Sequence, residues 1–180
     1  MRNSLPRSNT VPGDHHRGYG MKVNGANRFI ISGRIRLILR DVKTGKVEVS
    51  RWYKNLMPIA GRQAVGRRLG NIALKANEGM VTYGAVGTGV TAPDAADVKL
   101  ETEICRKLIA SADYSANVVT IRTFFATSEA VGDLKEFGLF GEEASAVIDT
   151  GTLFQHAAID RTKTNTKTLT IESEITISQG

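Results

Sequence analysis

The residues best placed to do chemistry are the glycines of Gly84-Ala85-Val86-Gly87-Thr88-Gly89, which end a stretch typical of a β-strand. A glycine-rich loop after a strand can cradle phosphate with its backbone N–H groups. Phosphate-binding loops, however, continue into a helix whose N-terminus holds the anion, and a P-loop also needs Gly-Lys-Ser/Thr. Here Val90-Thr91-Ala92-Pro93 follows, which cannot open such a helix. We therefore interpret the glycines as a structural bend, because glycine at a strand end permits a bulge or close backbone approach.

Acidic residues follow the glycines at Asp94, Asp97, Glu101 and Glu103 and could offer oxygen ligands to calcium. Their spacing does not match the EF-hand loop, and the glycine that the EF-hand needs at its turn is missing. We therefore expect a solvated acidic face rather than a metal site.

The remaining candidates are histidines and the single cysteine. His15 and His16 are adjacent, so both cannot easily reach one metal, and no Cys/His spacing fits zinc. His156 lies in an apolar stretch, which favours a strand-face histidine over a catalytic base. Cys105 adjoins Arg106, which could lower the pKa of the thiol, but its apolar neighbours favour a buried thiol. No nucleophile or paired-carboxylate motif is present, so we expect no catalytic residue, cofactor or metal, and no enzyme.

The elements that would position these residues are mostly strands. Residues 34–40 alternate, with Ile35, Leu37 and Leu39 on one face, which predicts a half-buried strand. A hairpin connection at 41–46 leads into a second alternating stretch, in which either Trp52 or Tyr53 could point inward. Six further segments have the composition of strands: Met80–Val86, Glu103–Ser111, Val118–Thr127, Leu134–Phe140, Thr152–Ala158 and Thr168–Ile177. A tight turn is expected between two of them, at Asp113–Asn117.

One helix is expected near residues 58–76, starting at Pro58. Its glycines each weaken it by about 1 kcal/mol relative to alanine, but small residues would let it lie close against a sheet. The pattern predicts a mainly β fold, an antiparallel β-sandwich or flattened barrel of about eight strands with one α-helix. Residues 28–180 would form this single domain. Residues 1–27 lack a helical or strand period and would form an extended basic N-terminal arm.

Composition and charge limit the kinds of partner that the chain could bind. A hydrophobic content of 41% can supply a core, and no apolar run approaches the roughly 18 residues of a membrane span or the core of a secretory signal. Residues 1–79 carry 16 Lys and Arg against 4 Asp and Glu, a net charge of +12, and residues 80–180 carry 8 against 14, a net charge of −6. Such polarity suits an acidic partner surface, stacking on copies of the chain, or nucleic acid.

The partner-binding residues that we expect lie in the arm and on a basic face: Arg2, Arg7, Arg17, Arg28, Arg34, Arg36, Arg40, Arg62, Arg67 and Arg68. Those on the strand and helix could form a stripe for nucleic acid. Aromatic residues make up only 6% of the chain and do not interleave with these arginines, which disfavours a stacking platform for bases.

The order of short motifs resembles a group of small tailed-bacteriophage structural proteins. The motifs are N-L-x-x-x-x-G at 55–61, A-V-G-T-G-x-x-A-P at 85–93 and E-x-G-L-F at 136–140, with Leu100-Glu101-Thr102-Glu103, Gly151-Thr152-Leu153 and a closing Thr168–Ile171 segment. The resemblance covers residues 34–177. The closing strand departs from the group, whose members more often carry an aromatic residue there.

This resemblance implies a non-enzymatic virion subunit, made in the host cytoplasm. It would decorate or cement the capsid or form part of the tail, baseplate or a fibre adaptor. Its partners would be other virion proteins and copies of itself. The arm lies outside the resemblance, and we expect it to anchor on neighbours because it is basic and too polar to fold alone. The alternative is a DNA-contacting protein at the head–tail junction. No membrane partner is expected.

Overall fold

The computed structural model describes residues 29–70, 72 and 80–179. In this part of the chain, nine strands and one helix follow each other in the order β1 Phe29–Asp41, β2 Val47–Val49, β3 Tyr53–Lys54, α1 Ile59–Leu69, β4 Val81–Gly87, β5 Glu103–Ser115, β6 Val118–Phe125, β7 Gly132–Gly141, β8 Thr152–Lys163 and β9 Lys167–Gln179. The expected arm at 1–27 lies outside the described residues. The helix is neither long nor apolar enough to cross a membrane, and these residues hold no other candidate span.

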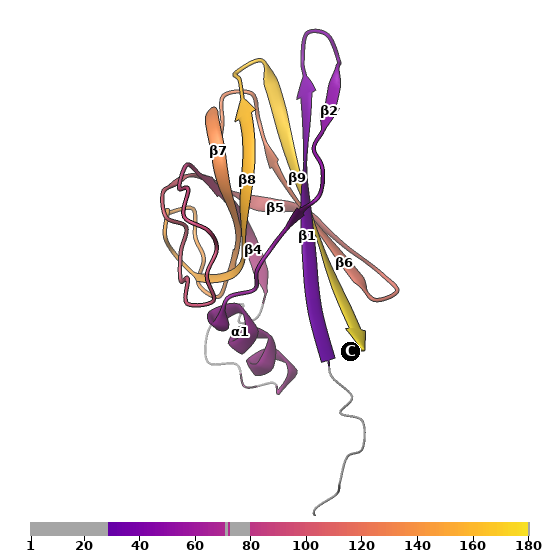
Figure 1. The fold of residues 1–180 in the computed structure, drawn as a ribbon, viewed down its shortest axis with the longest axis vertical. Helices are drawn as coiled ribbons and strands as arrows, with labels where there is room; N and C mark the ends of the chain where they lie inside the picture. Colours follow the sequence, from indigo (N-terminus) through magenta and orange to yellow (C-terminus); the bar gives the residue numbers. More distant parts are fainter. Residues whose placement is uncertain (1–28, 71, 73–79, 180) are drawn as a thin grey trace, which may run out of the picture.

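The strands form one antiparallel sheet with the order β2-β1-β9-β6-β5-β4-β7-β8, and β3 pairs with β1 beside β2. The sheet curls into an open half-barrel, with β1, β9 and β6 facing β4, β7 and β8 (Figure 1). Strand β5 joins the two sides, because its first half pairs with β4 and its second half with β6. The predicted mainly β fold of about eight strands with one helix is confirmed.

The core fills the inside of the curl. Ile35, Leu37 and Leu39 of β1 are at most 1% exposed, which confirms the predicted alternation. In β9 the inward positions include Leu169 and Ile171, and the buried Ser173 donates a hydrogen bond to Oε1 of Gln155 at 2.5 Å across the core.

The end of β4, the second half of β7 and the first half of β8 are buried on both faces. Residues 88–102 and 142–151 cover their outer side, where Ala85, Leu100, Phe140 and Leu153 form a second apolar cluster. Figure 1 shows these segments beyond β7 and β8, away from the core. Burial on both faces explains why the Phe137–Phe140 stretch is apolar without alternation.

The predicted second strand of the first hairpin is interrupted. The hydroxyl oxygen of Ser50 accepts a hydrogen bond from the Leu37 N–H at 2.9 Å and donates to the Arg51 carbonyl, so a side chain takes over one ladder contact. The break directs Tyr53 towards the core, where its hydroxyl donates to the Asp160 carbonyl at 3.1 Å. Trp52 instead lies outside, against arginines of β1.

Two predicted boundaries also differ. The turn expected at Asp113–Asn117 is tighter, because β5 continues to Ser115 and Ala116 takes a positive φ of 52°. The helix ends at Leu69, with Gly70 as its C-cap, whereas the prediction extended to 76. Residues 71 and 73–76 of that prediction lie outside the described residues.

Candidate functional site

Glu136 is the centre of the most elaborate polar cluster, on the outer face of β7. Its carboxylate is 1% exposed and accepts three backbone hydrogen bonds from the segments that flank residues 90–100. Oε1 accepts from Gly89 N at 3.0 Å and Thr102 N at 2.8 Å, and Oε2 accepts from Glu101 N at 2.9 Å. Backbone N–H groups thus hold this carboxylate by hydrogen bonds, as they hold the phosphate in a phosphate-binding loop.

The glycine stretch is shaped by that carboxylate. A Cβ on Gly87 would collide with Oε1 of Glu136, and one on Gly89 would lie 2.6 Å from the same atom. The pairing of β4 with β5 shifts register between Val86 and Gly87, so the predicted bend is present. In this structure the anion next to the glycines is the protein's own.

His156 of β8 lies beside Glu136, under the same covering segment. It is 3% exposed, its Nδ1 is 2.7 Å from Oδ2 of Asp97, and its Nε2 is 3.4 Å from Oε2 of Glu136. Burial acts to lower the pKa of His156, but hydrogen bonds and charge from Glu136 and Asp97 outweigh it and raise the pKa. Burial acts to raise the pKa of Glu136, but His156 and the three backbone N–H groups lower it.

This trio is suited to holding structure rather than to nucleophilic catalysis. A catalytic histidine presents one ring nitrogen to a hydroxyl or thiol, whereas both ring nitrogens of His156 face carboxylates. A hollow of about 290 Å³ adjoins His156 and is walled mainly by residues 91–101. Among the described residues no group of His, Cys, Asp or Glu is arranged to hold a metal ion.

Glu103 and Arg106 form a second buried cluster. Their side chains are 0% and 1% exposed and join through two hydrogen bonds of 2.5 and 2.7 Å. Arg106 also donates to the carbonyls of Ser145 and Thr150 and lies 4.5 Å over the Phe140 ring. The prediction of a solvated acidic face is therefore wrong for Glu103, because the 142–151 segment covers the start of β5. It is also wrong for Asp97, which binds His156.

Lys163 is a third buried charge, 1% exposed at the end of β8. Its ammonium donates to the carbonyls of Ala126 at 2.9 Å and Thr127 at 3.0 Å, and burial lowers its pKa. Cys105 lies against the core, where burial raises the pKa of its thiol. The direction of this shift is opposite to that of an activated cysteine.

The predicted basic face of β1 is largely paired. Arg34 and Arg36 lie 2.7 and 2.6 Å from Glu174 and Glu172 of β9, and their guanidinium groups stack 4.2 and 4.7 Å from the Trp52 ring centroid. Arg40 is exposed and has no ion pair among the described residues.

The helical arginines lie elsewhere, on α1 over β8. Arg67 contacts the buried Glu142 at 2.6 Å, while Arg62 and Arg68 are exposed and form no ion pair within the described part of the chain. The two predicted groups therefore occupy different elements. The arm residues Arg2, Arg7, Arg17 and Arg28 lie outside the described residues.

The sequence did not predict that Glu136, Arg106 and Lys163 bind distant backbone groups. Their partners are 34 to 47 residues away for Glu136, and 36 and 37 away for Lys163. The available signal was a charged residue inside an apolar strand, which indicates burial but not what it binds. Comparisons with models of protein families, with curated proteins and with solved structures find no match.

Proposed function

We propose that this protein is a non-enzymatic structural subunit of a tailed-bacteriophage virion. It decorates or cements the capsid or forms part of the tail or baseplate, and it contacts copies of itself and neighbouring virion proteins. The order of the motifs between residues 34 and 177 supports this placement, because it resembles that of small phage structural proteins.

The observation that supports the structural role is that buried charged side chains bind backbone groups of other segments. Glu136 binds backbone N–H groups at Gly89, Glu101 and Thr102, Arg106 binds carbonyls of the 142–151 segment, and Lys163 binds carbonyls at 126–127. Each buried charge thus fixes the backbone of a surface segment. Surface segments held in this way suit a subunit that packs against neighbours.

Particle composition tests the placement. Phage particles are purified on a density gradient from cells that make the chain with its native neighbours, and the chain is quantified by mass spectrometry. We expect a fixed copy number per particle, and lower incorporation when residues 1–27 are deleted. Absence of the full-length chain from the particles would overturn the virion assignment, and unchanged incorporation of the deletion variant would overturn the anchoring role of the arm.

DNA contact at a head–tail junction is the second candidate, and the exposed Arg62 and Arg68 favour it. Their charges have no partner among the described residues, so they are available to phosphates. The role predicts micromolar or tighter duplex binding that weakens steeply with salt. A flat mobility-shift titration at low salt would exclude it.

A further inference from the structure

Strand β1 has an open edge at its start. On one side it pairs with β9 along its whole length, from Phe29–Gln179 to Asp41–Lys167. On the other side it pairs only at residues 34–35 with β3 and at residues 38–40 with β2. Among the described residues, nothing therefore pairs with this side of residues 29–33. An unpaired strand edge offers a row of backbone donors and acceptors to an added strand.

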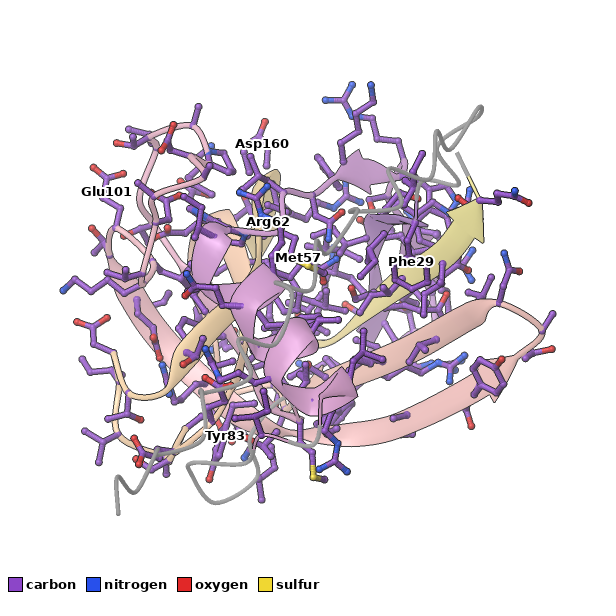
Figure 2. All side chains as sticks on the ribbon, turned by 90° about the horizontal axis from the view of Figure 1, so that it is seen from below. Phe29, Met57, Arg62, Tyr83, Glu101 and Asp160 are labelled. Atoms are coloured by element: carbon purple, nitrogen blue, oxygen red, sulfur yellow. The ribbon has the colours of Figure 1, made fainter. Side chains whose placement is uncertain are left out.

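Two hollows follow this edge. One, of about 350 Å³, is lined by Gly33, Asn55 and Gln155 among others. The other, of about 390 Å³, is apolar and runs from Phe29 and Ile31 to Leu69 and Met80. Figure 2, which looks onto this end of the molecule, shows Met57 between α1 and Phe29.

Among the described residues, apolar side chains lie uncovered along the second hollow. Phe29 is 62% exposed, Leu69 75% and Met80 46%, although all three line an apolar surface. An extended strand can cover such side chains with its own apolar residues while its backbone pairs with the open edge of β1.

The sequence immediately before β1 has the pattern of such a strand. The arm as a whole has no sustained period, but Tyr19-Gly20-Met21-Lys22-Val23 alternates, with Tyr19, Met21 and Val23 on one face. Asn24 and Gly25 follow, which are residue types that turns favour. Five residues, 24–28, then separate this segment from Phe29, a length found in hairpin loops.

We propose that residues 19–23 form a strand that pairs antiparallel with residues 29–33 of the same chain and covers the open edge of β1. A five-residue loop places Val23 opposite Phe29, Met21 opposite Ile31 and Tyr19 opposite Gly33. Ile31 packs against the core, so Met21 faces inward and Lys22 faces solvent.

The same chain is favoured over a second copy because the connection is short. Closing a five-residue loop costs less free energy than bringing two molecules together at ordinary concentrations. The proposal does not depend on a virion role. It limits what the arm can do for any partner, since only residues 1–18 remain free, a reach of at most about 60 Å when extended.

The alternation of inward and outward side chains provides the first test. In the full-length protein, Met21→Asp should speed amide hydrogen exchange at residues 29–33 by about tenfold or more, because it puts a charge against the core. Lys22→Asp is the matched control, one residue away but on the solvent face, and should leave exchange unchanged. Equal effects of the two substitutions, or no effect of either, would overturn the strand.

Disulfide trapping provides the second test. It also shows whether the added strand comes from the same chain or from a second copy. In a Cys105→Ala background, Lys22→Cys with Ile30→Cys places two outward thiols opposite each other, within disulfide reach. We expect an intramolecular disulfide on oxidation with diamide, seen by intact mass and non-reducing electrophoresis. Lys22→Cys with Arg36→Cys, on the same face but out of register, should not form one. A disulfide-linked dimer in the 22/30 variant would make a second copy the occupant, and absence of any disulfide would exclude the pairing; either result overturns the proposal.

Discussion

At the scale of single residues, buried polar and charged side chains lie against polar partners. His156 is almost fully buried, and its two ring nitrogens face Asp97 and Glu136. The sequence predicted a strand-face position for His156, and it lies in β8. It did not predict the partners, since Asp97 is 59 residues distant and reaches His156 only through the covering segment.

Because the pKa of His156 is raised, we expect the stability of the fold to decrease as pH rises. A histidine whose pKa in the folded protein exceeds its ordinary value of 6.5 stabilises the fold while it is protonated. This contribution is complete below about pH 6.5 and is lost as pH rises through the folded-state pKa. Glu136, whose pKa is lowered, stays charged over this range. We therefore expect the free energy of unfolding to fall on going from mildly acidic to alkaline buffer.

Urea denaturation at a series of pH values measures this dependence. The His156→Gln variant is the control, since it keeps a polar side chain but cannot be protonated, and its unfolding free energy should vary less over the same range. His15 and His16 are present in both proteins, so any contribution from them cancels in the comparison. Equal slopes for the two proteins would show that His156 does not contribute.

At the scale of elements, the sequence pattern predicted strands correctly where one face is buried and the other is exposed to solvent. Strand β1 was predicted with its inward face because Ile35, Leu37 and Leu39 fall on one face of an alternating stretch, and all three are buried. In β7 the outer face is covered as well, so the alternation disappears and the apolar run does not reveal which side holds Glu136. The break at Ser50 was also missed, because it depends on a hydrogen bond with the backbone of Leu37.

The helix offers a test of the prediction that small residues allow close packing on the sheet. A Cβ on Gly61 would lie 2.5 Å from the Phe154 carbonyl oxygen of β8, whereas a Cβ on Gly66 would meet nothing within 4 Å. Gly66→Ala should therefore stabilise the protein by roughly 0.5–1 kcal/mol, the difference in helix propensity. Gly61→Ala gains the same propensity but must push the helix off β8, so it should destabilise the protein by about 1–3 kcal/mol.

Chemical denaturation of the two variants gives both values. The comparison is matched, since both substitutions add one methyl group to the same helix. Stabilisation by both would mean that α1 does not pack closely on β8, and destabilisation by both would mean that the helix tolerates no added side chain on either face.

At the scale of the whole molecule, the separation of charge along the chain is only partly a separation in space. Arg34 and Arg36 of the basic half meet Glu174 and Glu172 of the acidic half within the sheet, so pairing cancels part of the polarity on folding. Summed charge along the sequence could not reveal this, because it depends on β1 lying beside β9. The described basic groups that remain without an ion pair include Arg62 and Arg68 on the exposed side of α1.

Self-association should therefore depend on salt through the helix rather than through β1. If copies of the chain attract each other by unpaired charge, the mass measured by light scattering should fall between low salt and about 0.5 M NaCl, as the screening length becomes shorter than the spacing of charges. Arg62→Glu with Arg68→Glu should lower the mass at low salt, because it reverses the charge of the exposed helix face.

A charge-neutral control separates this effect from loss of fold. Arg34→Gln with Glu174→Gln removes one ion pair without changing net charge and should leave the association unchanged, since surface pairs contribute little to stability. If this control lowers the mass as much as the helix variant does, the outer face of β1 is the contact. If neither variant changes it, the association does not depend on Arg62, Arg68 or the Arg34–Glu174 pair.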